Sequence, residues 1–197
     1  MNRFYLVMSA IFGPIIHLFY PVTVSGLENL PKDQSVVLCA NHASAWDPLL
    51  ICLALPRSMP IRIMAKKELM EIPFIGWIIK KLGAFGVDRG HSDLNAVKTA
   101  IKAVRNGESL LVFPEGTRVE HEGQERAKGG VVMIAMRTGA ALIPVYVGGK
   151  KRPFHRTHIV FGEPFCPVTA TRHGTAEEYQ EFADEVLRRA YALAGKD

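Results

Sequence analysis

Short runs of consecutive apolar residues punctuate this 197-residue chain and alternate with segments of helical spacing. The runs that we expect to form strands are 22–24, 36–40, 60–65, 84–87, 109–113, 142–147 and 157–162. Helical segments between and after them include residues 96–104 and an amphipathic stretch at 176–194. Strands that are apolar throughout, rather than at alternate positions, are typical of parallel sheets covered on both faces. The pattern predicts a single α/β domain, residues 21–197, with a largely parallel central sheet flanked by helices.

One polar octapeptide, Asn-His-Ala-Ser-Ala-Trp-Asp-Pro at residues 41–48, follows the apolar run 36–40. Pro48 disfavours helical geometry at the residue before it but fits the first turn of a helix, so Asp47 is expected to cap that helix. A loop between His42 and Asp47 then lets the carboxylate fold back onto the imidazole. An Asp that accepts from one ring nitrogen fixes the tautomer and leaves the other nitrogen as a general base. A helix cap beside an unrelated polar residue explains the octapeptide alone equally well.

The charge balance of the chain favours an acidic partner. The formal net charge is +5 and the isoelectric point is about 9.2, which suits a phosphate ligand, an anionic lipid surface or a nucleic acid. Hydrophobic residues make up 48% of the chain, which excludes a disordered protein. The three cysteines, Cys39, Cys52 and Cys166, are scattered, so we expect buried thiols in a reducing cytosol rather than disulfides or a zinc site.

Residues 4–20 form an apolar N-terminal stretch that only Ser9 and His17 interrupt. Its length is at the lower limit for a membrane-spanning helix, and Gly13-Pro14 in its middle is expected to kink it. Residues 1–20 are therefore predicted to be an apolar, membrane-associating helical segment, either an interfacial or a re-entrant membrane helix. A greasy helix packed on the domain is the alternative.

A second apolar stretch lies within residues 66–81. Pro73 and Gly76 are expected to split it into two short helices. Its second half suits an acyl-chain pocket, contact with lipid or ordinary core packing.

Polar and basic side chains recur just after the predicted strands. His42, Arg89 and the segment 115–118 each follow one of them. Because ligands of parallel α/β sheets bind at the carboxyl ends of the strands, these residues are expected to share one rim. Guanidinium groups bind anions through paired N–H groups, and Gly116 permits close backbone approach to a phosphate. A single arginine after a strand is more often a solvated charge, so the prediction depends on the recurrence.

Four short segments carry the most specific signal in the chain. They are Asn41-His42 with Asp47, residues 83–89 (GAFGVDR), residues 113–118 (FPEGTR) and residues 142–145 (LIPV). In this order they resemble the four sequence blocks of glycerolipid acyltransferases of the PlsC type, whose signature is N-H-x-x-x-x-D. A lone histidine and aspartate at this spacing would be weak evidence, whereas four ordered matches are specific.

The resemblance implies transfer of a fatty acyl group to the 2-hydroxyl of 1-acylglycerol 3-phosphate, which gives phosphatidic acid. His42 would take the hydroxyl proton as the alkoxide attacks the thioester carbonyl, and Asp47 would orient His42. Lys66 would stabilise the oxyanion, a role for which Lys67 competes. The residues expected to bind substrate are Asn41, Arg89, Glu115, Gly116, Thr117 and Arg118, of which Arg89 and residues 115–118 would hold the acceptor phosphate. Direct attack needs no nucleophilic Ser or Cys, and no metal or cofactor is expected beyond the acyl-carrier-protein or coenzyme A thioester.

The expected partners are lysophosphatidic acid, the acyl thioester and an anionic membrane surface. The expected location is the cytoplasmic face of the cell membrane, with peripheral or monotopic attachment. The closest alternative is another acceptor of the same superfamily, glycerol 3-phosphate or a lyso-ornithine lipid. A non-catalytic protein that binds anionic membranes also fits the basic cluster at residues 150–152 and does not need His42 or Asp47. Nucleic acid is not expected as a partner because stacking aromatics do not accompany that cluster. A nucleotide hydrolase is not expected either, because the sequence has no glycine-rich phosphate loop of the G-x-x-x-x-G-K-S/T type.

Overall fold

The computed structural model describes residues 3–88, 93–119, 124–148, 151–169 and 174–195. Its elements in chain order are α1 (Arg3–Phe19), β1 (Val22–Ser25), the short 3-10 helix η1 (Leu27–Asn29), β2 (Val37–Ala40), α2 (Asp47–Ala54), β3 (Ile61–Lys66), α3 (Lys67–Glu71), α4 (Ile75–Lys81), β4 (Ala84–Val87), α5 (Leu94–Arg105), β5 (Ser109–Val112), α6 (Gly130–Thr138), β6 (Leu142–Val147), β7 (Thr157–Phe161) and α7 (Ala176–Tyr191). Each predicted strand is present, with bounds that differ by at most one residue at either end.

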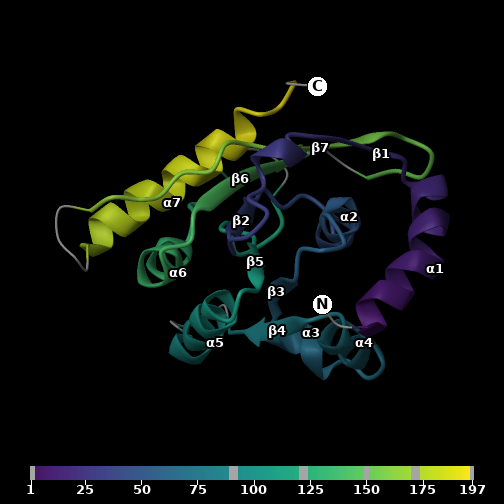
Figure 1. The fold of residues 1–197 in the computed structure, drawn as a ribbon, viewed down its shortest axis with the longest axis horizontal. Helices are drawn as coiled ribbons and strands as arrows, with labels where there is room; N and C mark the ends of the chain where they lie inside the picture. The colour runs from purple at the N-terminus through teal and green to yellow at the C-terminus, as the bar shows by residue number, and fades with distance from the viewer. Residues whose placement is uncertain (1–2, 89–92, 120–123, 149–150, 170–173, 196–197) are drawn as a thin grey trace.

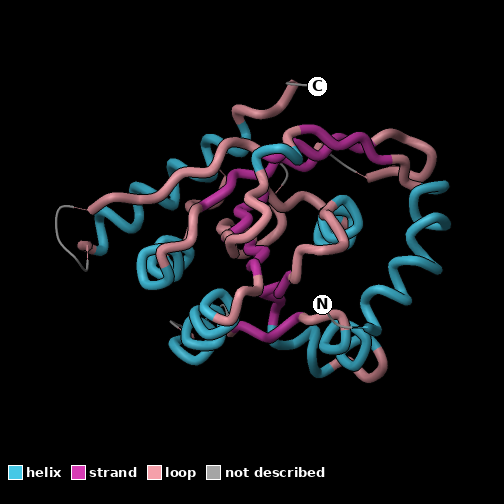
Figure 2. Tube along the Cα trace, in the orientation of Figure 1, coloured by secondary structure: helices cyan, strands magenta, loops and turns pink. Residues whose placement is uncertain are grey.

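The seven strands of the described residues form one sheet in the order β1-β7-β6-β2-β5-β3-β4. Every neighbouring pair is parallel except β6 and β7, which are antiparallel. Figure 2 shows the strands running through the middle of the molecule with helices on both sides. The prediction of a single α/β domain with a mostly parallel central sheet flanked by helices is confirmed.

Helices cover the two faces of the sheet (Figure 1). Successive side chains of a strand point to opposite faces, so a strand that is apolar throughout must be covered on both. In β2, Leu38 and Ala40 belong to a buried cluster with α2, and parts of α1 pack against that cluster. Val37 and Cys39 belong to the opposite cluster, with α5, α6 and α7. β2 lies between β5 and β6, so its carboxyl end is surrounded by the carboxyl ends of two parallel neighbours.

α1 is one helix that continues through Pro14 and curves along its length (Figure 1). Its inner side packs on the domain: the Tyr5 hydroxyl donates to the Cys52 carbonyl at 2.6 Å. Just beyond its end, Tyr20 stacks on Trp46 with ring centroids 4.7 Å apart. Among the described residues, no helix is both long enough and apolar enough to cross a membrane. The helix is thus continuous through Gly13-Pro14, where the sequence predicts a kink.

α3 and α4 are the two short helices expected between residues 66 and 81, but Gly76 does not separate them. Gly76 lies inside α4, and only residues 72–74 intervene. A Cβ at Gly76 would meet the Met70 carbonyl oxygen at 2.2 Å. The glycine is therefore needed for the close packing of α4 on α3. From the sequence alone the same glycine is interpreted as a helix breaker.

Candidate active site

His42 and Asp47 form a buried pair at the carboxyl end of β2. Asp47 Oδ2 lies 3.1 Å from His42 Nδ1, and the His42 and Asp47 side chains are 10% and 0% exposed. The same oxygen accepts hydrogen bonds from the N–H groups of Ala43 and Ser44, at 2.8 and 2.6 Å. The loop thus turns the carboxylate back onto the imidazole, as the sequence predicts. When Nδ1 donates to Asp47, Nε2 is the nitrogen that can accept a proton.

Asp47 does not cap α2, which corrects the expected start of that helix. α2 begins at Asp47 itself, Trp46 precedes it and Pro48 lies in its first turn. The Oδ2 atom is occupied by His42 and by N–H groups of the preceding loop, so no side-chain cap forms. The carboxylate therefore stabilises the loop that carries His42 rather than the helix that follows.

The segment after β5 fixes the backbone of His42 on both sides. The His42 N–H donates to Glu115 Oε2 at 2.8 Å, and the Val119 N–H donates to the His42 carbonyl at 2.8 Å. The Tyr191 hydroxyl, at the end of α7, donates to Glu115 Oε1 at 2.5 Å. Burial raises the pKa of Glu115, and the bonds from Tyr191 and from the His42 N–H oppose that rise. Glu115 is 2% exposed and both of its oxygens accept hydrogen bonds within the protein, so it holds the His42 loop, and its part in acceptor binding stays a prediction.

Asn41 also has a structural place that differs from the substrate-binding role expected of it. Its Nδ2 donates to the Val147 carbonyl at 3.2 Å, and its Oδ1 accepts from the Val147 N–H at 2.7 Å. The side chain is buried and clamps the end of β2 to the end of β6. This clamp sets where the chain leaves the sheet one residue before His42.

Lys151 is the part of the site that the sequence does not reveal. Its Nζ lies 3.1 Å from Asp47 Oδ1, and its side chain is 1% exposed. The alternative of a membrane-binding protein relies on a basic surface at residues 150–152, and the buried side chain of Lys151 does not contribute to such a surface. No pattern distinguishes a lysine that enters the core after β6 from the exposed Arg152 beside it. Position 150 lies outside the described residues.

An apolar cavity of about 450 Å³ opens beside His42. Its walls come from α1, α2, β3 and α4, and Phe113 lies against the imidazole with ring centroids 4.2 Å apart. Ile78 and Ile79 line the cavity, whereas Trp77 of the same helix is 54% exposed. The apolar second half of residues 66–81 thus contributes to a pocket wall and to the surface.

The other predicted site residues divide between the rim and the undescribed parts of the chain. Lys66 lines the cavity, and its Nζ is paired with Glu68 at 3.0 Å. Thr117 and Arg118 are exposed, one to two residues before the Val119 N–H that binds His42. Gly116 has a φ of +73°, which favours glycine in this turn. Arg89 lies outside the described residues.

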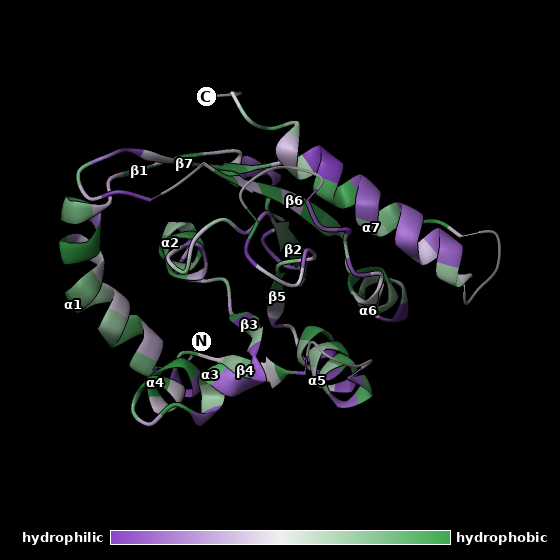
Figure 3. Ribbon diagram, turned by 180° about the vertical axis from the view of Figure 1, so that it is seen from behind, coloured by the Kyte–Doolittle hydropathy of each residue, from purple (hydrophilic) through white to green (hydrophobic). Residues whose placement is uncertain are grey.

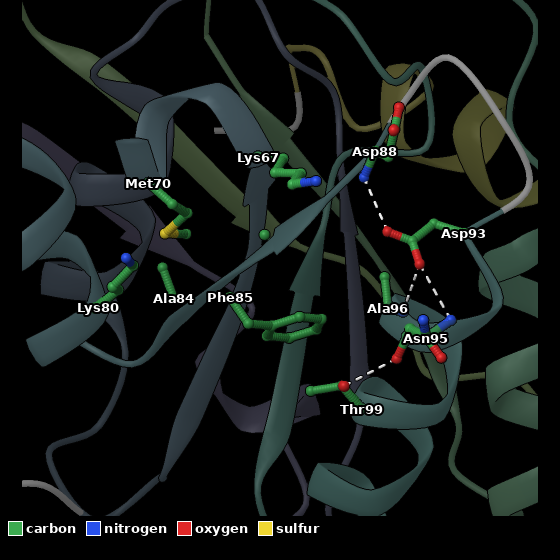
Figure 4. Close-up of a pocket in the computed structure, with 11 residues that line it drawn as sticks. Lys67, Met70, Lys80, Ala84, Phe85, Asp88, Asp93, Asn95, Ala96 and Thr99 are labelled. Carbon is green, nitrogen blue, oxygen red and sulfur yellow. Dashed lines mark hydrogen bonds between the residues drawn. The ribbon is translucent and has the colours of Figure 1, made fainter. Parts of the chain in front are cut away.

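A second, open pocket of about 720 Å³ lies over β4 and the start of α5 (Figure 4). It shares one lining residue, Ala84, with the cavity beside His42. Asp93 accepts from the N–H groups of Asp88, Asn95 and Ala96, so its carboxylate caps α5. These backbone bonds lower the pKa of Asp93, which is a capping effect rather than a sign of chemistry.

Residues 21–148 match the acyltransferase family. The chain belongs to this family. A 1-acyl-sn-glycerol-3-phosphate acyltransferase from Bacillus subtilis is 34% identical over 189 residues, which cover 92% of each chain. An enzyme of the same name from Borreliella burgdorferi is 36% identical over 126 residues, and this acyltransferase chain spans half of that relative's length. The crystal structure of PlsC from Thermotoga maritima, described as a 1-acyl-sn-glycerophosphate acyltransferase, matches with a TM-score of 0.68 at 23% identity over 100% of this chain and 96% of that one, which shows a shared fold.

The hydrogen bond from Tyr191 to Glu115 should make the stability of this acyltransferase depend on pH. Tyr191→Phe removes a donor to a carboxylate, a loss of about 1.5–3 kcal/mol for a bond to a charged group. A buried acid with a raised pKa loses stability as pH rises from its unfolded value through its folded value, and removing the donor raises the folded value further. Thermal melts should therefore show a larger destabilisation at pH 8 than at pH 5. Tyr146→Phe, in β6, is the control and should show no such dependence on pH. An equal loss of stability in Tyr191→Phe at both pH values would contradict the coupling between Tyr191 and the ionisation of Glu115.

Proposed function

We propose that the protein transfers a fatty acyl group from an acyl thioester to the 2-hydroxyl of 1-acylglycerol 3-phosphate, forming phosphatidic acid. The observation that carries this proposal is the buried His42–Asp47 pair at the wall of an apolar cavity. A general base beside apolar space brings a hydroxyl and an acyl chain to one place. The names of the relatives from Bacillus subtilis and Borreliella burgdorferi support the choice of acceptor.

In this reaction Nε2 of His42 removes the proton of the acceptor hydroxyl as its oxygen bonds to the thioester carbonyl carbon. Asp47 accepts the Nδ1–H bond and stabilises the imidazolium that forms. The tetrahedral intermediate carries negative charge on the former carbonyl oxygen, and the ammonium group of Lys66, a residue that lines the cavity, is suited to stabilise it. Collapse breaks the carbon–sulfur bond, and the imidazolium returns its proton to the leaving thiolate. The step balances without a covalent enzyme intermediate or a further cofactor.

Membrane attachment at the cytoplasmic face is part of this proposal. The outer side of α1 exposes Val7, Ile11, Ile15 and Leu18 at 50–69%. Figure 3 shows the contrast with α7, which alternates hydrophilic and hydrophobic residues while α1 is largely hydrophobic. Phe74, at the junction of α3 and α4, is 74% exposed, and the exposed Trp77 of α4 contacts Phe4 of α1. A surface of this size suits the interface from which an amphiphilic acceptor must be drawn.

An acyltransferase assay in mixed micelles tests the function. Purified protein is given lysophosphatidic acid, glycerol 3-phosphate or a lyso-ornithine lipid, each with acyl-carrier-protein and coenzyme A thioesters. We expect transfer to lysophosphatidic acid. Turnover of a different acceptor alone would change the substrate of this proposal. Absence of acyl transfer in every combination, with membrane binding that His42→Ala leaves intact, would favour a non-catalytic membrane-binding protein.

Arg118→Ala should mainly raise the KM for the phosphorylated acceptor. Its guanidinium is exposed beside the His42 loop, where it is able to pair with a phosphate without touching the reacting atoms. Loss of a charge-assisted hydrogen bond of about 1.5–3 kcal/mol predicts a KM increase of roughly 10-fold to 100-fold with a small change in kcat. Arg57→Ala, at an exposed position before β3 and hence at the opposite end of the sheet, is the control. A raised KM for the thioester instead would reassign Arg118 to the donor.

A further inference from the structure

The ammonium group of Lys151 is buried against the Asp47 carboxylate. The Lys151 Nζ lies 3.1 Å from Asp47 Oδ1, and the two side chains are 1% and 0% exposed. Nζ also donates to the Gly148 carbonyl, at the end of β6. Lysine is almost never fully buried unless it is paired, because an unpaired charge in the core is strongly destabilising. The position of Lys151 is therefore tied to the negative charge of Asp47.

The two oxygens of Asp47 have different partners. Oδ2 lies against His42 Nδ1 and accepts two backbone N–H groups, while Oδ1 faces Lys151. With one oxygen held on each side, the carboxylate plane is fixed and Oδ2 stays aimed at the imidazole. Lys151 thus contacts Asp47 rather than His42 itself, and neither Lys151 nor Asp47 is among the residues that line the cavity beside His42.

We propose that Lys151 is a positioning residue for the reaction, which holds Asp47 ionised and oriented toward His42. This inference rests on the proposed function, because it assigns Lys151 a part in the proton transfer that His42 performs. Burial lowers the pKa of Lys151, and the Asp47 charge opposes that fall, so the pair keeps its charges only while both members are present. Lys151, Asp47 and His42 then form one buried chain of charge and hydrogen bonds.

The charge of Lys151 also sets when the His42–Asp47 pair takes up a proton. Among the described residues, the other ionisable groups near the pair include Glu115, with Tyr191 behind it, and the cavity-lining residues Lys66, Tyr5 and Cys52. A cation 3.1 Å from Asp47 disfavours protonation of the pair. Because a neighbouring positive charge disfavours the protonated form, removing that cation should move proton uptake by the pair to higher pH. The step belongs to the pair as a whole, whichever member binds the proton.

Lys151→Met tests this inference, because methionine keeps the length of the buried stem without the charge. Histidine NMR, with the His42 signal assigned from the His42→Ala variant, should show the titration midpoint raised in Lys151→Met. The acidic limb of the kcat/KM profile should move in the same direction. Near neutral pH, kcat should fall about 10-fold to 100-fold with little change in acceptor KM. This loss is smaller than the 10²–10⁴-fold contribution of a general base, because the base itself is still present. Arg152→Gln, which removes an exposed charge from the next position, should change neither. An unchanged NMR midpoint in folded Lys151→Met would overturn the proposal.

A pair of further variants keeps the test decisive if Lys151→Met is too unstable to study. In Asp47→Asn, Lys151 becomes a buried cation without its counter-charge, so adding Lys151→Met should raise the melting temperature. In the parent protein the same substitution should lower it, because it leaves the Asp47 charge unpaired. The same sign of change in both backgrounds would mean that the two side chains are not coupled.

The NMR readout does not depend on turnover, so the two proposals fail separately. Acyl transfer by the parent with identical His42 midpoints in the parent and Lys151→Met would remove Lys151 from the mechanism and leave the function standing. A midpoint raised in Lys151→Met, together with no acyl transfer by the parent to any acceptor, would leave the coupling standing and remove the function.

Discussion

His42→Ala should reduce the rate of acyl transfer by about 10²–10⁴-fold while the protein stays folded, because it removes the only proposed acceptor of the hydroxyl proton. The imidazole is 10% exposed and its backbone is held by Glu115 and Val119, which the substitution leaves in place. Rates are measured with lysophosphatidic acid at saturating thioester, so that kcat and the acceptor KM separate. We expect the loss to appear in kcat, while the acceptor KM changes by a few fold at most.

The control for this experiment is His155→Ala, at an exposed position in the connection between β6 and β7. It changes the same residue type without touching the His42 loop and should retain the parent's rate. A rate for His42→Ala within a few fold of the parent would exclude general-base catalysis by this imidazole. Circular dichroism and melting temperature establish that each variant is folded.

Asp47 is a less suitable target, because removing its carboxylate should also destabilise the fold. Its carboxylate accepts from Ala43 and Ser44 and is paired with Lys151, so Asp47→Ala leaves a buried cation and two N–H groups without that partner. Breaking a buried ion pair by removing one member typically costs about 3–5 kcal/mol. Reduced activity of Asp47→Ala would therefore mix a catalytic and a folding effect, which is why the chemistry is tested at His42.

The fold was predictable because strands and helices leave periodic apolar patterns. Buried runs such as 36–40 and 142–147 are long enough to identify, and the loop from His42 to Asp47 follows from Pro48. Gly76 misled the prediction because its role is tertiary: it admits a carbonyl from α3. A single sequence carries no signal for an approach between residues that only the fold brings together.

The same limit applies to the support of the candidate site. Asp47 is five residues from His42, and such a local pair is visible in the sequence. Glu115 looks like a ligand for phosphate because it stands in a loop after a strand, and only its partners in the structure show both oxygens occupied. Tyr191 and Lys151 reach the site from the end of α7 and from the connection after β6, both far from His42 in the sequence. Contacts of this kind depend on packing, which a motif does not record.

The outer face of α1 should control membrane binding, and Ile11→Glu with Leu18→Glu should largely abolish it. These two side chains are 55% and 69% exposed, whereas Ile16 and Tyr5 of the same helix pack against the core. Burying an apolar side chain contributes about 1.5–3 kcal/mol, so losing two predicts a partition coefficient lower by roughly 10²–10⁴-fold. The substitutions leave the inner side of α1 and the wall of the cavity in place, which deletion of residues 1–20 would not.

Co-sedimentation with vesicles that contain anionic phospholipid, at low and at high salt, measures this effect. The parent should stay bound at high salt because apolar burial is not screened, whereas residual binding of the double variant should be released by salt. Asn95→Glu with Thr99→Glu adds the same charge to exposed positions of α5, on the opposite side of the sheet, and should bind as the parent does. The α1 variant should keep its activity toward detergent-dispersed acceptor and lose it toward acceptor in bilayers. Full sedimentation of a folded α1 variant at high salt would show that membrane binding resides elsewhere, and the exposed Phe74 and Trp77 would be the next surface to change.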